Sequence, residues 1–232
     1  MKKIHIQPVF FVYLVLAFSL IAGCKKDDSD DNPASTVKDA DGNVYHTLTI
    51  GTQTWMVENL KTTKYRNGNP IPQVADSAQW IVLTTGAFCY YDNTSTIGDT
   101  YGLLYNWFAV NDPRNIAPKG WHVATSDEWN TLNAFLGGEM VSGGKLKETG
   151  STHWNSPYTS AKDEVGFKAL PGGGRTNLGN FQNLGKQGLW WTSTENNAAD
   201  AWPRGLSSDF AMLFMSFSLD KNSGFTVRCI KD

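Results

Sequence analysis

An apolar segment near the N-terminus separates a part of the chain that serves targeting from a part that can fold. Residues 9–21 are mostly apolar, and Lys2 and Lys3 precede them. A positive start followed by such a run is typical of a secretory signal. The run has about 13 residues, whereas a helix that spans a bilayer needs about 20. We therefore expect residues 1–23 to be a signal peptide.

The apolar character ends at Cys24, where charged residues begin. The sequence Leu20-Ile21-Ala22-Gly23-Cys24 resembles the lipobox of a bacterial lipoprotein, with small residues before the cysteine. The resemblance implies that Cys24 is lipidated and that the membrane is a partner through this anchor. Several acyl chains on one cysteine would make the anchoring firm. The alternative is a signal peptide that is removed without lipidation.

Residues 24–36 contain four acidic residues, no aromatic residue and no aliphatic residue larger than alanine. Such a segment cannot bury enough surface to fold, so we expect a disordered acidic tether. Its Cys-Lys-Lys-Asp-Asp pattern also resembles the export signal that places lipoproteins on the outer face in Bacteroidota. This resemblance implies an outer membrane lipoprotein exposed at the cell surface. The alternative is a generic linker charged for solubility.

Residues 37–232 have the length of one domain with a sizeable core. The chain holds 22 glycines, nine tryptophans, eight tyrosines and 12 phenylalanines. This composition favours a loop-rich fold packed by large aromatic side chains rather than by long helices. The formal net charge is -2, so no basic face indicates a nucleic-acid partner.

Apolar and polar residues alternate on both sides of Gly51 over residues 44–57, which predicts a β-hairpin with one buried face. Asp39–Asn43, just before it, resembles the start of an EF-hand loop. It lacks the glutamate at position 12 of such a loop, so we interpret it as an Asp-Gly turn. Residues 92–99 also carry oxygen ligands that could hold calcium, but turn chemistry explains them equally, and we predict a loop there.

The clearest helix is predicted over residues 126–136. Thr125 and Glu128 have the spacing of a capping box, and the apolar residues that follow have helical spacing. Gly137-Gly138 is expected to end the helix. Gly143-Gly144-Lys145 lacks the first glycine and the Ser/Thr of a phosphate-binding loop, so that interpretation is rejected.

The remaining elements are predicted with less support from the pattern. We expect a short helix over residues 103–110 and a strand at 166–170 that runs into a glycine-rich turn before Arg175. The other expected strands are 87–91, 189–194, 212–217 and 224–230, with a hairpin turn at 220–224 between the last two.

Two cysteines remain after Cys24 is set aside, Cys89 and Cys229. In an oxidising compartment two such residues often form a disulfide. A bond closing so long a loop would stabilise the domain by about 4–5 kcal/mol in the chain-entropy model. The alternative is two buried free thiols.

A series of short segments, in order along the chain, resembles the Fibrobacter succinogenes major paralogous domain. These segments are Asp41–Tyr45, Ile50–Met56, Glu58–Leu60, Tyr101–Trp107, Pro118–Val123, Glu128–Trp129, Thr152–Trp154, Trp190–Glu195 and Gly224–Cys229. The resemblance implies a surface or secreted protein of uncharacterised activity. Many members carry a cysteine just before the Pro-x-Gly-Trp-His block, where this chain has Ile116 and Ala117. That difference leaves Cys89 as the one possible intrachain partner of Cys229.

Thr125–Trp129, Leu170–Gly174 and Gly224–Arg228 resemble segments of the formylglycine-generating enzyme superfamily more distantly. This resemblance implies an α+β, C-type-lectin-like fold with short mixed strands and hairpins, one or two short helices and many loops. The oxidases of that superfamily bind copper through a closely spaced cysteine pair. Cys229 stands alone in that region, so the oxidase activity is not carried over.

Motifs for catalysis are sparse. The part after Cys24 has three histidines, His46, His122 and His153, without His-x-x-x-His spacing, and it has neither Cys-x-x-Cys nor Gly-x-Ser-x-Gly. We interpret His122 as a structural histidine and assign no catalytic residue, metal ligand or cofactor. A glycosidase needs only two carboxylates, so an extracytoplasmic enzyme acting on polysaccharide stays open as the alternative.

Together with the surface anchoring that the lipobox resemblance implies, the aromatic-rich composition favours a non-catalytic module that binds or adheres to a glycan, a peptide or a protein ligand. A purely structural surface protein is the second alternative. Aromatic and arginine side chains on loops are the expected contacts. The candidate ligand-binding residues are Trp154, Tyr158, Arg175, Trp202 and Arg204. The tryptophans expected in the core are Trp55, Trp107, Trp121, Trp129 and Trp190.

Overall fold

The computed structural model describes residue 1 and residues 35–157, 160–214 and 217–232. The described residues from 35 onward belong to one compact unit. Nearly all of the expected signal peptide and tether, including Cys24, lies outside the described residues, and so does Tyr158. Within the described part, no helix is long and apolar enough to cross a bilayer.

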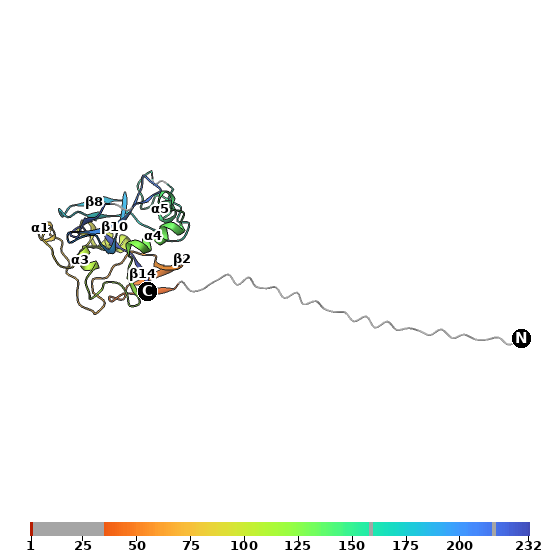
Figure 1. The fold of residues 1–232 in the computed structure, drawn as a ribbon, viewed down its shortest axis with the longest axis horizontal. Helices are drawn as coiled ribbons and strands as arrows, with labels where there is room; N and C mark the ends of the chain where they lie inside the picture. The colour runs from red at the N-terminus through yellow and green to blue at the C-terminus, as the bar shows by residue number, and fades with distance from the viewer. Residues whose placement is uncertain (2–34, 158–159, 215–216) are drawn as a thin grey trace. The chain divides into compact units, whose positions relative to one another are not determined.

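The architecture is mixed α+β and consists mostly of short strands (Figure 1). One antiparallel sheet has the order β1-β2-β3-β14-β6. Its strands are β1 (Thr36–Lys38), β2 (Val44–Ile50), β3 (Gln53–Met56), β14 (Cys229–Lys231) and β6 (Trp121–Val123). The C-terminal strand therefore lies between the N-terminal hairpin and β6, so the two ends of the domain are held in one sheet.

The second sheet has the order β11-β10-β9-β7-β8, with β12 paired to β10 and β13 paired to β9. Its strands are β7 (Gly172–Arg175), β8 (Phe181–Leu184), β9 (Gln187–Glu195), β10 (Asp200–Ser207), β11 (Leu213–Phe214), β12 (Leu219–Asp220) and β13 (Thr226–Val227). A third, two-stranded sheet joins β4 (Phe88–Cys89) to β5 (Leu104–Tyr105). The long pair of β9 and β10 forms the centre of the second sheet.

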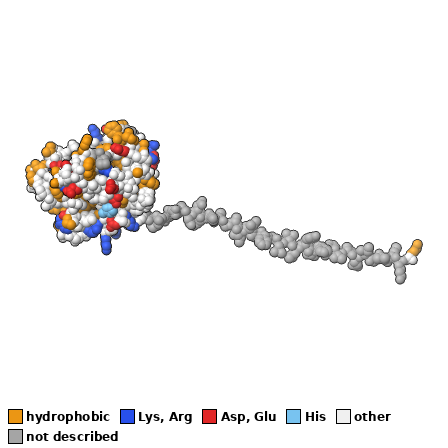
Figure 2. All heavy atoms as spheres, viewed as in Figure 1, with side chains coloured by type: hydrophobic (Ala, Val, Ile, Leu, Met, Phe, Trp, Pro, Cys, Tyr) orange, Lys and Arg blue, Asp and Glu red, His pale blue; other side chains and the backbone are white. Residues whose placement is uncertain are grey.

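The helices are short. They are α1 (Ser77–Trp80), the 3₁₀ helix η1 (Tyr91–Asn93), α2 (Ser95–Tyr101), α3 (Trp107–Val110), α4 (Ser126–Phe135) and α5 (Glu139–Leu146). Figure 1 shows α4 and α5 on the same side of the unit, where α4 contacts β10 and α5 contacts β11. The side chains of Met140 and Val141 on α5 are exposed. Figure 2 shows that hydrophobic side chains reach the surface at several places on this face of the unit.

Three local predictions are confirmed. Gly51 has a φ of 61° at the turn between β2 and β3, which glycine adopts without steric cost. Asp39 accepts hydrogen bonds from the backbone N–H groups of Asp41 and Asn43 and from the Tyr45 hydroxyl, so its carboxylate closes a turn. Helix α4 has both hydrogen bonds of the predicted capping box.

Three other predictions were wrong in detail, and a fourth was confirmed in part. Residues 92–99 are largely helical rather than a loop, and residues 103–110 divide into β5 and α3. The segment 220–224 does not join a hairpin, because β12 pairs with β10 whereas β13 pairs with β9. Of the strand expected at 212–217, Leu213–Phe214 forms β11, while residues 215 and 216 lie outside the described residues.

The glycine-rich segment before Arg175 is itself a strand, β7, and not a turn. A Cβ on Gly173 would lie 2.5 Å from the carbonyl oxygen of Gln182, and one on Gly174 would lie 2.7 Å from the ring of Phe225. The glycines are therefore required by close packing between strands. The turn propensity of glycine predicted a turn here, but tertiary contacts place the segment in a strand.

The core consists of three clusters of buried apolar residues. The five tryptophans expected in the core are all buried. Trp55, Trp129 and Phe167 pack edge to face or tilted, with ring centroids 5.0–5.8 Å apart, which is a favourable geometry for aromatic pairs. Aromatic packing therefore organises the interior, as the composition indicated.

Cys89 and Cys229 are both free and buried. Cys89 lies in β4 within one cluster, whereas Cys229 lies in β14 within another. The disulfide that the sequence left open is thus absent from the structure, and the alternative of two buried thiols is the one observed. Burial raises the pKa of the Cys89 thiol to about 12, which makes it unreactive at neutral pH.

Candidate functional site

The residues expected to form an exposed binding patch do not form one. Trp154, Arg175 and Arg204 have exposed fractions of 1%, 0% and 2%. Trp202 is half-buried in β10, and Tyr158 lies outside the described residues. The patch proposed from the sequence is therefore corrected: three of its members are structural.

Each of these three side chains is occupied by contacts within the domain. Arg175 donates to the carbonyl oxygens of Val74, Ala75 and Gly179. Trp154 Nε1 donates to the Ala169 carbonyl oxygen at 3.0 Å. Polar side chains inside a protein interior need such partners, and here the partners are backbone groups rather than a ligand.

Arg204 was misplaced because β10 was not recognised as a strand. Pro203 lies inside this strand, where it removes a backbone donor, and the pairing of β10 with β9 shifts register between Ala201 and Pro203. A proline in a sequence argues against a central strand, and the bulge is what accommodates it. Arg204 then reaches the Ser126 carbonyl and Asn130 Oδ1, both at 2.9 Å.

A cavity lies elsewhere, between the N-terminal hairpin and the segments around Glu148 and Lys168. Its volume is about 520 Å³, within the range of about 300–1,000 Å³ that is typical of ligand pockets. Its lining residues are His46, Thr47, Val57, Glu58, Asn59, Thr100, Glu148, Gly166, Lys168, Leu170 and Arg228. We call this space the hairpin cavity.

One wall of the hairpin cavity carries a histidine–glutamate pair from the hairpin. His46 lies on β2 and Glu58 follows β3, so the antiparallel pairing brings them together. The ring Nδ1 of His46 lies 2.6 Å from Glu58 Oε1, and the His46 backbone N–H donates to Glu58 Oε2 at 2.8 Å. Both carboxylate oxygens are thereby fixed in position.

A second histidine–glutamate pair lies at the segment that follows α5. His153 Nδ1 lies 2.6 Å from Glu148 Oε2, and the His153 ring meets Tyr101 edge to face at a centroid distance of 5.5 Å. Burial, together with the Glu148 charge, raises the pKa of Tyr101. Two carboxylates, each oriented by a histidine, therefore line one cavity.

Beneath these pairs lies a buried polar floor formed by Arg228 and Asn59. Arg228 donates to Asn59 Oδ1 through Nε at 3.0 Å and through Nη2 at 2.8 Å, and its Nη1 donates to the carbonyl oxygens of Met56 and Phe167. Asn59 Oδ1 also accepts from Trp190 Nε1 at 2.8 Å. No carboxylate pairs with Arg228 among the described residues, and burial lowers its pKa to about 9.

The charges that line the hairpin cavity balance. Glu58 and Glu148 are negative, and Lys168 and Arg228 are positive, when the histidines are neutral. A cavity with carboxylate acceptors, an ammonium donor and threonine hydroxyls, but without net charge, suits a neutral ligand rich in hydroxyl groups. Within the described residues, no group of three or more His, Cys, Asp or Glu side chains is arranged to hold a metal ion.

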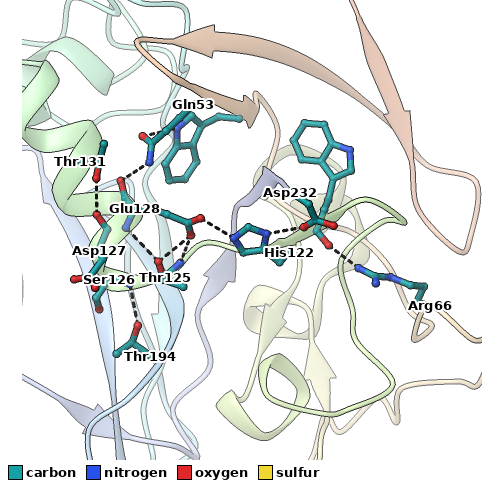
Figure 3. A network of polar contacts seen from close by, with 12 residues as sticks. Gln53, Arg66, His122, Thr125, Ser126, Asp127, Glu128, Thr131, Thr194 and Asp232 are labelled. Carbon is teal, nitrogen blue, oxygen red and sulfur yellow. Dashed lines mark hydrogen bonds and ion pairs between the residues drawn. The ribbon is translucent and has the colours of Figure 1, made fainter.

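The other prominent polar network surrounds His122 and is structural. His122 Nε2 lies 2.7 Å from Glu128 Oε1, and Nδ1 lies 2.8 Å from Asp232 Oδ1 (Figure 3). Burial opposes protonation, but the two carboxylates outweigh it and raise the pKa of His122. The ring thus joins the start of α4 to the C-terminus, and the capping role predicted for Glu128 is confirmed.

The hairpin cavity was not predicted from the sequence, although several residues in or beside it lie in segments that carry the family resemblance. Glu58 and Asn59, His153, and Arg228 belong to three of the segments that carry the family resemblance. Those segments are far apart in the chain and meet only in the fold. Glu148 and Lys168 lie outside those segments, and a charged residue outside any recognisable motif gives no such signal.

The comparisons with known proteins give one match. The model of the Fibrobacter succinogenes major domain matches residues 48–231, and that description states no activity. No curated protein and no solved structure matches the chain. The match covers more than half of the chain and includes every residue of the hairpin cavity except His46 and Thr47. The chain therefore belongs to the Fibrobacter succinogenes major domain family.

Proposed function

We propose that this protein is a surface-exposed outer membrane lipoprotein whose domain binds an extracellular glycan in the hairpin cavity without transforming it. The observation that carries the proposal is the charge-balanced set of Glu58, Glu148, Lys168 and Arg228 around one space. The C-type-lectin-like fold implied by the distant resemblance is part of the same proposal. Its support is that this domain, like that fold, consists of short strands and many loops.

A saccharide fits this lining better than a charged peptide does. Carboxylates accept hydrogen bonds from sugar hydroxyls, and the Lys168 ammonium donates to them. Both carboxylates are held by histidines before any ligand arrives, so little side-chain entropy is lost on binding. Val57 and Leu170 add apolar surface for the C–H face of a sugar ring.

The proposal predicts that the cavity carboxylates contribute strongly to affinity. We expect Glu58→Gln and Glu148→Gln each to weaken binding about 10- to 100-fold, because a hydrogen bond to a charged group contributes about 1.5–3 kcal/mol. The measurement is a titration of the full chain, purified in mild detergent, with ligands found on an array of neutral and charged glycans. Glu139→Gln, at an exposed site on α5, is the matched control and should bind as the unmodified chain does. Silence across the array, or equal affinity in all four proteins, would contradict the proposal.

A second candidate function is an enzyme acting on polysaccharide, and it is favoured by the same two carboxylates. Glycoside hydrolysis needs a pair of them at opposite faces of the scissile bond. Reducing ends released from polysaccharide by the unmodified chain, but not by Glu58→Gln or Glu148→Gln, would establish this candidate over simple binding.

The anchoring part of the proposal has a separate test. If Cys24 carries the lipid, Cys24→Ala should move the protein from the membrane fraction to the soluble fraction, because the acyl chains supply the membrane affinity. Fractionation followed by immunoblotting measures this, and Cys89→Ala serves as the control. Unchanged partitioning of Cys24→Ala would refute lipidation.

A further inference from the structure

We propose that a second site, on the other sheet, binds a neutral saccharide through aromatic rings and side-chain amides. The site is a groove of about 250 Å³ across the face of the sheet that contains β9 and β10. Its lining residues are Thr176, Asn177, Gln182, Gln187, Leu189, Phe214, Phe217, Leu219, Ser223 and Phe225. We call it the aromatic groove, and it shares no residue with the hairpin cavity.

The lining of the aromatic groove has a composition that selects its ligand. None of the ten residues is charged, half of them are apolar, and the other half carry hydroxyl or amide groups. Rings stack on the apolar face of a sugar, while amides both donate to and accept from its hydroxyls. A charged ligand would lose its hydration without gaining a counter-charge. The chemistry therefore points to a neutral saccharide.

The aromatic floor of the groove is built into the sheet. Phe214 lies over Gly205 of the neighbouring strand, where a Cβ would come within 2.3 Å of the Phe214 ring. Phe225 packs on Trp191 with ring centroids 4.7 Å apart. Phe217, in contrast, is 90% exposed. Packing on Gly205 and on Trp191 thus holds the rings of Phe214 and Phe225 in place, while the ring of Phe217 is exposed to solvent.

A polar group in the groove lacks a partner. Ser223 is 5% exposed, and its hydroxyl makes no hydrogen bond to the described residues. The buried side-chain atoms without partners in that part of the chain are Tyr65 Oη and Trp129 Nε1, so Ser223 Oγ is not sealed from solvent. A buried residue whose hydroxyl has no partner in the protein but keeps some accessible surface leaves a polar group that a ligand can bond.

The position of the groove argues against a peptide strand as its occupant. Its lining comes from β8 at one end of the sheet order, from β9 and from β11 at the other end, so it crosses the face of the sheet. A peptide that adds a strand needs the open backbone groups of a sheet edge. On a face, recognition depends on side chains, which is how rings and amides bind sugars.

The test is isothermal titration of the full chain in mild detergent with neutral hexasaccharides of glucose, xylose, mannose and galactose. We expect at least one to bind and Phe217→Ala to weaken that binding about tenfold or more. Because Phe217 is exposed, its truncation should leave the unfolding midpoint unchanged. Phe135→Ala, which removes a 60% exposed ring on α4, is the matched control and should retain full affinity.

The outcome separates this site from the hairpin cavity. If Glu58→Gln and Glu148→Gln abolish saccharide binding while Phe217→Ala has no effect, the aromatic groove is not a site and the hairpin cavity is. If Phe217→Ala alone reduces affinity, the groove is established whatever the cavity does. The proposal is overturned if no hexasaccharide binds, or if Phe135→Ala and Phe217→Ala lose affinity equally.

Discussion

Replacing Arg228 with methionine is expected to lower the free energy of unfolding by about 3–5 kcal/mol, because several buried hydrogen-bond acceptors lose their donor. The change leaves the carbonyl oxygens of Met56 and Phe167 without their donor and removes two of the three hydrogen bonds to Asn59 Oδ1. Each orphaned buried acceptor costs about 1–3 kcal/mol. Relief of the desolvation of the guanidinium offsets only part of this loss.

Urea unfolding followed by tryptophan fluorescence measures the effect of Arg228→Met. Trp190 lies at the site, because its Nε1 and the Arg228 guanidinium both donate hydrogen bonds to Asn59 Oδ1. Arg228→Lys should lose an intermediate amount, since a single ammonium cannot serve three separated acceptors. Arg114→Met is the control: the Arg114 side chain is 40% exposed in its ion pair with Asp112, and such exposed pairs contribute little to stability. A stability of Arg228→Met equal to that of Arg114→Met would contradict the assignment of Arg228 as the floor of the cavity.

Arg175→Ala is expected to destabilise the domain by about 3 kcal/mol rather than to affect ligand binding alone. Its guanidinium donates to three backbone carbonyl oxygens and lies 4.5 Å from the ring centroid of Trp80 and 4.9 Å from that of Phe181. The substitution removes these hydrogen bonds and leaves a void among the rings, and both effects destabilise.

Limited proteolysis provides a second readout for Arg175→Ala. The side chain ties Val74 and Ala75 to β7, so cleavage near residues 74–77 should increase as that segment opens locally. Lys186→Ala, at an exposed site, is the control and should leave both stability and cleavage unchanged. Unaltered stability of Arg175→Ala would contradict the assignment of Arg175 as a structural residue.

The elements that were predicted correctly are those whose cause is local. The Thr125–Glu128 capping box and the alternation around Gly51 lie within a few residues of the structures that they specify. The elements that were missed have distant causes. Pro203 can lie in β10 because a bulge against β9 accommodates it. Gly173 and Gly174 are needed in β7 because neighbouring segments of the fold leave no room for a Cβ there.

The candidate sites also divide into features with local causes, which the sequence predicted, and features with distant causes, which it did not. Aromatic side chains were correctly expected to matter, but the sequence did not distinguish Trp154, which is buried, from Phe217, which is exposed. Both have polar and small neighbours in the sequence. Burial is decided by which segments pack around a residue, and the two residues differ only in that respect.

The sequence by itself indicated the family and the mixed α+β class through resemblance to known families. It determined the aromatic core and the helix cap because these depend on residue type and short-range spacing. The tertiary structure alone decided that Glu58, Glu148, Lys168 and Arg228 line one cavity. Their segments are separated by tens of residues. Only the insertion of β14 beside the N-terminal hairpin brings the end of the chain, and with it Arg228, next to Asn59.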